Sequence, residues 1–135
     1  MTPTQFQAAI NANLVDWQAT NFPALPVVFE DGPAPAQDSI GPIWLDATFR
    51  WFGSQSTSVG ITAGGRYTGA VSLMVYYRPG EGTAQREAVL ESLKRLFKHR
   101  RIGGATLGFP QRATPTEALG WRKAGLLVPF NLDEV

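Results

Sequence analysis

The sequence predicts a single α+β domain, in which a mostly antiparallel β-sheet carries two main helices on one face. Three observations lead to this prediction. The chain has 135 residues, which is the usual size of one domain. Two segments have apolar residues at helical spacing, and several others alternate between two faces as strands do. No linker separates two cores, so residues 1–135 are expected to fold as one unit.

The first helix is predicted over residues 2 to about 20. Its apolar residues recur at spacings of four, four and three, which places them on one helical face: Phe6, Ile10, Leu14 and Trp17. Thr2 or Thr4 can cap its start, and the prolines at 23 and 26 cannot continue it. A short strand is expected at 27–30, followed by a loop over 31–42.

Two long strands are predicted at 43–52 and 66–78, because both alternate between two faces. The second is apolar on both faces, which is typical of a strand that is central or covered by a partner. The segment between them is small, polar and rich in glycine, so it has little to bury. We therefore expect a flexible hairpin arm at about 53–66.

The second helix is predicted from 83 to about 100, with Thr83 as its N-cap and the glycines at 103 and 104 after its end. Its apolar stripe contains Val89, Leu90, Leu93, Leu96 and Phe97. A weak strand is expected at 105–109, a turn at about 110–118, and a last strand at 119–130.

The composition excludes several classes of function. The chain has no cysteine and one histidine, His99, which excludes thiolate zinc sites and leaves little scope for a histidine-rich one. The net charge of +1 argues against direct nucleic-acid recognition, and no apolar run is long enough to span a membrane. No cofactor is expected.

The turn at 79–82 has the order of a phosphate-binding loop, since it lies between a strand and a helix. Gly80 and Gly82 are only two residues apart, no lysine follows, and the carboxylate of Glu81 would repel a phosphate. We therefore interpret this turn as a tight corner.

An alternative with chemistry would be a small metal-dependent hydrolase that uses Asp46, Glu30 or Glu81 to hold a divalent cation. The spacing of these carboxylates does not bring two or three of them together, so the alternative is the weaker one.

Aromatic and arginine side chains are unusually frequent on the predicted strands, and such a combination is typical of protein–protein contact surfaces. The aromatic residues are Trp44, Trp51, Tyr67, Tyr76, Tyr77 and Trp121. They could equally be ordinary residues of a sheet with two covered faces.

The stretches "LDATFRWFG", "GGRYTGAVSLMVYYRPGEGTAQREAVLESLKRLF" and "GWRKAGLLVPF" resemble the tail terminator (tail completion) proteins of long-tailed bacteriophages and phage-like particles. The resemblance covers nearly the whole chain and implies no catalytic residue. It implies a ring of identical subunits, usually six, that caps the tail tube, stops its polymerisation and offers the head–tail connector a docking surface.

The implied partners are further copies of the chain, the tail tube protein and the connector or neck protein. The implied location is the neck-proximal end of the virion tail, after assembly in the host cytoplasm. We expect five contact residues: Arg50, Arg66, Tyr67, Tyr76 and Arg78. Another neck, head–tail connector or minor tail protein of the same small α+β type remains the alternative.

Overall fold

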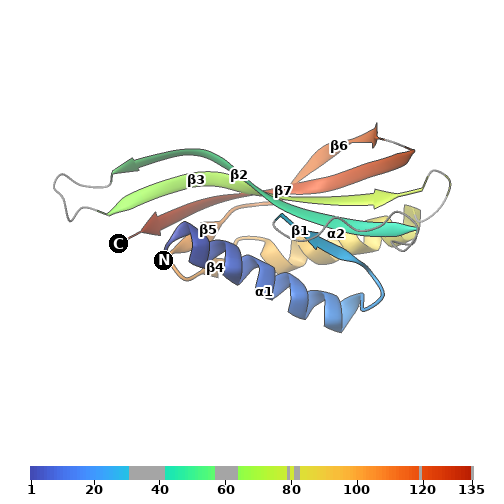
Figure 1. Cartoon of the computed structure of the whole chain (residues 1–135), viewed down its shortest axis with the longest axis horizontal. Coiled ribbons are helices and arrows are strands. Elements are labelled where there is room, and N and C mark those ends of the chain that lie inside the picture. The colour runs from blue at the N-terminus through green and yellow to red at the C-terminus, as the bar shows by residue number, and fades with distance from the viewer. Residues whose placement is uncertain (31–41, 57–63, 79, 81–82, 119, 135) are drawn as a thin grey trace.

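The structure is a computed structural model that describes residues 1–30, 42–56, 64–78, 80, 83–118 and 120–134. Within these residues, two helices pack on one face of a curled seven-stranded sheet (Figure 1). All strand pairings are antiparallel except one. The predicted α+β class, with a mostly antiparallel sheet and helices on one face, is confirmed.

Helix α1 spans Pro3–Asn21 and begins with a reciprocal cap. The Gln5 backbone N–H donates to the Thr2 hydroxyl, and the Thr2 backbone N–H donates to the Gln5 side chain. The four apolar residues predicted to share a face are all buried, because that face lies against the sheet: Phe6, Ile10, Leu14 and Trp17.

Helix α2 spans Thr83–Phe97, so Thr83 is already helical and the helix ends about three residues before the predicted end. His99 has a φ of 50°, a left-handed conformation that breaks the helical path. The glycines at 103 and 104 do not end the helix. They connect strands β4 and β5, and Gly103 also has a positive φ.

The sheet has the order β1-β2-β3-β7-β5-β4, with β6 paired to β7 beside β5. Strand β1 runs parallel to β2. The strand order places β1 and β4 at opposite edges of the sheet. The strands are β1 Val27–Phe29, β2 Ile43–Ser56, β3 Gly65–Tyr77, β4 Arg101–Ile102, β5 Ala105–Leu107, β6 Gln111–Ala118 and β7 Trp121–Glu134.

The predicted arm is partly strand. Strand β2 continues to Ser56, which pairs with Gly65 of β3, after a bulge between Trp51 and Gly53. The two strands thus form one long hairpin that extends past the helices at the left of Figure 1. The tip of the predicted arm, residues 57–63, and the loop at 31–41 lie outside the described residues.

Two predictions at the C-terminal end were wrong. The segment predicted as a turn at about 110–118 forms β6, which pairs along β7 from Gln111↔Leu127 to Ala118↔Trp121. The last strand runs on to Glu134, since its final residues pair with the start of β3. Backbone pairing to β7 accounts for β6, whereas the longer β7 also continues its alternation, since Leu132 is buried like Phe130.

The core lies between the helices and the facing side of β2, β3 and β7. Odd-numbered residues of β2 and β3 and even-numbered residues of β7 supply this side, and most are fully buried. The opposite side of the sheet, called here the outer face, carries Trp44, Asp46, Arg50, Tyr76, Trp121 and Lys123. Neither of the two helices covers the outer face (Figure 1).

Candidate functional site

Three aromatic rings and a guanidinium gather at one end of the outer face, and we call them the aromatic cluster: Trp44, Tyr76, Arg78 and Trp121. The cross-strand neighbours Trp44 and Tyr76 stack with centroids 4.1 Å apart and planes 6° apart. Trp121 meets Trp44 edge-on, and the Arg78 guanidinium lies 3.8 Å from the centre of the Trp121 ring. The cluster is therefore internally packed.

Polar groups in and beside the aromatic cluster lack a hydrogen-bond partner in the described part of the chain or have a shifted pKa. The indole N–H of Trp44 is buried and finds no acceptor among the described residues. Partial burial, and then the charge of Asp46, raise the pKa of the Tyr76 phenol. Burial raises the pKa of Asp46 itself, the nearby Glu30 raises it further, and Lys123 lowers it. The carboxyl of Asp46 thus lies in a partly dry setting.

A second group lies at the base of the long hairpin, where β2 and β3 pass the end of α1. Trp51 contacts the rings of Phe6, Tyr67 and Phe130 and is 38% exposed. Its neighbour Phe52, in the bulge, is 68% exposed. Together with Pro3 and Tyr67, these two side chains line an open hollow beside the hairpin.

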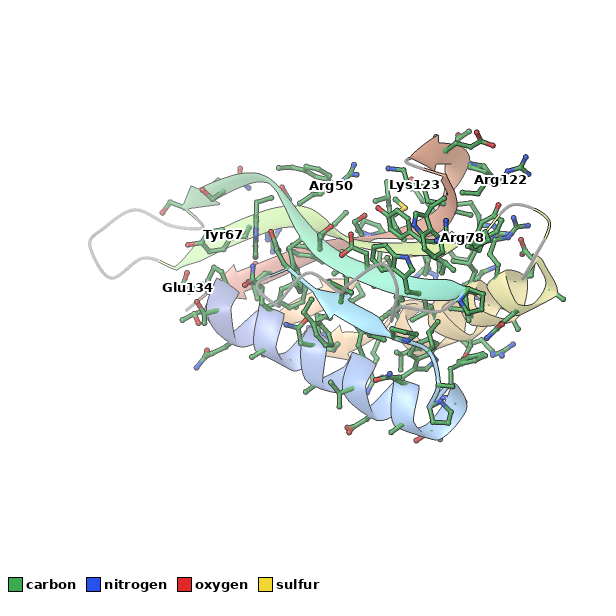
Figure 2. All side chains as sticks on the ribbon, turned by 45° about the vertical axis from the view of Figure 1, so that its right-hand side comes forward. Arg50, Tyr67, Arg78, Arg122, Lys123 and Glu134 are labelled. Carbon is green, nitrogen blue, oxygen red and sulfur yellow. The ribbon has the colours of Figure 1, made fainter. Side chains whose placement is uncertain are left out.

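Polar contacts fix the base of the hairpin to the end of β7. Arg66 donates through Nε and Nη2 to both carboxylate oxygens of Asp133, at 2.7 and 3.3 Å. This pair lowers the pKa of Asp133 and raises that of Arg66. The Tyr67 hydroxyl donates to Glu134, which raises the pKa of the phenol, and Figure 2 shows these two side chains at the same end of the molecule.

The structure divides the five expected contact residues into two groups and one single residue. Tyr76 and Arg78 belong to the aromatic cluster, and Arg66 and Tyr67 to the base of the hairpin. Arg50 lies on the outer face, exposed, on the side of the sheet away from the helices (Figure 2). Their role as contacts stays a prediction, and Arg66 already has an intramolecular partner.

Two exposed aromatic residues were missed by sequence reasoning. Phe52 and Phe109 are 68% and 46% exposed. Phe52 could have been noticed, since it occupies the polar side of its strand directly before a glycine. Phe109 has no comparable signal, because it lies between β5 and β6, in a segment predicted to be strand.

The carboxylates considered for a metal-dependent hydrolase do not form a metal-ligand group among the described residues. Glu30 Oε2 accepts the backbone N–H of Phe49 at 3.2 Å. This hydrogen bond lies on the edge of β2, just after the residues that pair with β1. Glu81 lies outside the described residues. Across the described part of the chain, no three histidine or acidic side chains come together as metal ligands.

No helix among the described residues is long and apolar enough to cross a bilayer.

A family model described as phage tail terminator protein matches residues 5–108. A solved structure of 20% sequence identity superposes with a TM-score of 0.74, covering 98% of this chain and 96% of that one, which shows a shared fold. No curated protein sequence matches significantly. Because the family model covers well over half of the residues, the chain belongs to the phage tail terminator family.

Proposed function

We propose that the chain is the terminator of a phage tail: a ring, with six copies as the expected number, that caps the tail tube. Capping ends tube polymerisation and provides the surface on which the head–tail connector docks. The family match carries the proposal, since it assigns the chain a structural role in a phage tail. The partners are then other copies, the tube protein and the connector, at the neck-proximal end of a virion tail assembled in the host cytoplasm.

The hairpin β2–β3 supports contact with the tube. It projects beyond the helices, and Trp51 and Phe52 leave apolar surface exposed at its base. Exposed aromatic residues of this kind are enriched at protein contacts. The edge of β2 over residues 50–55 has no paired strand among the described residues, so it can add a strand from a partner.

The aromatic cluster supports contact on the outer face. Its rings and arginine are pre-packed, so a partner would meet a rigid surface at little entropic cost. Figure 2 shows Arg78, Arg122 and Lys123 at this same end of the sheet, opposite the hairpin. The expected contact residues Tyr76 and Arg78 belong to this surface, and Arg50 lies farther along the same outer face.

Electron microscopy of particles that lack the protein tests the proposal. Tubes should grow to uncontrolled lengths and should not join heads, whereas particles complemented with the unchanged chain should have uniform tails. Tails of normal length without the protein would refute the terminator role. They would favour the alternative of another neck, connector or minor tail protein.

A further inference from the structure

Charge is distributed very unevenly along the chain. Residues 1–49 contain five acidic residues and no lysine or arginine, whereas residues 92–116 contain six lysines and arginines and no acidic residue. The net charge of +1 therefore conceals a strongly acidic and a strongly basic segment. The basic residues are Lys94, Arg95, Lys98, Arg100, Arg101 and Arg112.

The fold places part of each segment on opposite edges of the sheet. Glu30 directly follows β1, the first strand of the sheet order, and Asp46 pairs with Val28 of that strand. We call these two carboxylates the acidic edge. Arg101 lies in β4, at the other end of the order, and Lys98 and Arg100 lead into it from α2. We call these three side chains the basic edge.

The two edges cannot neutralise one another within one copy. Five inter-strand spacings of about 4.8 Å separate β1 from β4 along the sheet, or about 24 Å in all. Exposed charges are largely screened beyond about 8–10 Å at physiological salt. Each edge therefore presents its own charge to the surroundings.

The charges on both edges are also left without ion pairs inside the described part of the chain. The four ion pairs there involve Arg66, Arg86, Arg112 and Arg122. Glu30 accepts a backbone N–H, and Asp46 has the attraction of Lys123 without a direct ion pair. Arg100 donates weakly to the Leu96 carbonyl at 3.5 Å. Asp133, the carboxylate whose pKa Arg101 lowers, is already held by Arg66.

We propose that copies of this chain associate head to tail, with the acidic edge of one copy against the basic edge of the next. The inference rests on the proposed ring and names the surfaces that close it. Two different surfaces that meet are what a closed ring requires, because a contact between identical surfaces stops at a dimer. Attraction between the edges guides approach and fixes orientation in a chain that is nearly neutral as a whole.

Charge reversal of each edge, alone and in combination, tests the proposal. One variant carries Glu30→Lys, and the other carries Arg100→Glu with Arg101→Glu. The first variant removes the net negative charge of the acidic edge, and in the second variant two edges of negative charge meet, so self-association of either variant alone should weaken by at least about tenfold. Mixed in equal amounts, the two variants should assemble again, because the lysine introduced in one variant faces the two glutamates introduced in the other, and the two unchanged edges still attract one another.

The assembly is measured by native mass spectrometry at low salt, with one variant mass-tagged so that alternation of the two variants is visible. Asp16→Lys is the matched control: this exposed acid lies on α1 and not on a strand at the sheet edge, gives the same change in net charge, and should leave assembly unchanged. Glu30→Gln keeps an acceptor for the Phe49 amide and should give a smaller loss, which covers the case that Glu30→Lys does not fold.

Three results would overturn the proposal: unchanged assembly of either variant alone, no recovery in the mixture, or an unchanged chain that stays monomeric at every concentration. A loss with Asp16→Lys as large as that with Glu30→Lys would overturn it too, since bulk charge would then suffice. Tail length in particles is scored separately. A ring built through other surfaces would therefore refute this inference and leave the proposed function standing.

Discussion

Replacing Trp51 with alanine should destabilise the fold, even though its residue type and position also suit a partner contact. Trp51 is 38% exposed and packs on Phe6, Tyr67 and Phe130. A tryptophan side chain can bury about 200 Å², so the covered part amounts to about 120 Å² and about 3 kcal/mol. Residual burial in the unfolded chain reduces the expected loss to about 2 kcal/mol.

Phe52→Ala is the matched control, because the two residues are adjacent and differ in exposure. Phe52 is 68% exposed, so its truncation should cost at most about 1 kcal/mol. For a domain of this size the two losses correspond to melting temperatures lower by about 8 °C and at most about 4 °C. Differential scanning calorimetry measures both. Equal losses, or a larger loss for Phe52→Ala, would refute the conclusion that Trp51 packs against its neighbours more fully than Phe52 does.

Two further substitutions test the sheet. A Cβ at Gly69 would overlap the carbonyl oxygen of Arg50, whereas one at Gly53 would meet nothing within 4 Å, so Gly69→Ala should cost about 1–3 kcal/mol in urea unfolding and Gly53→Ala much less. Burial and then Glu30 raise the pKa of Asp46, so its charged form destabilises the fold as pH rises above the ordinary value of 3.8. Asp46→Asn should therefore raise the melting temperature at pH 7, and a gain that does not shrink towards pH 3 would contradict this reasoning.

The helices were predictable because their faces are periodic. In α1, four apolar residues at regular spacing all proved buried, and Thr2 proved to be the cap. The strands 43–52 and 66–78 were predictable for the same reason, since their alternation matches burial on one face of the sheet. Periodicity reports which side of an element meets the core, and that information is local in the sequence.

The longer reach of the sheet was not predictable from side-chain pattern. Gly53 and Ser56 have nothing to bury, yet they pair with Thr68 and Gly65 of β3. The segment that forms β6 contains Pro115 and polar residues, and it is held as a strand by backbone bonds to β7 across an irregular register. A strand that is held by backbone hydrogen bonds to its neighbour can be predicted only when the position of that neighbour in the sheet is known.

The sequence predicted which types of residue form the candidate contact surfaces, but it did not predict which of these residues lie next to one another. Aromatic and arginine residues stood out on the strands, but the sequence did not show that Arg78 covers Trp121 while Arg66 binds Asp133. One arginine therefore stays beside aromatic surface, and the other is committed to an ion pair. This difference arises from the pairing of β3 with β7, which brings both acceptors to β3 from more than 40 residues away in sequence.

Net charge illustrates the same limit. A value of +1 argues against a chain that binds polyanions through its overall charge, but it says nothing of attraction between copies. The acidic and basic segments are visible in the sequence once charge is counted by region. Their meaning depends on the order β1-β2-β3-β7-β5-β4, because the same segments placed on adjacent strands would neutralise one another. It is the separation of β1 from β4 that turns an uneven composition into two complementary edges.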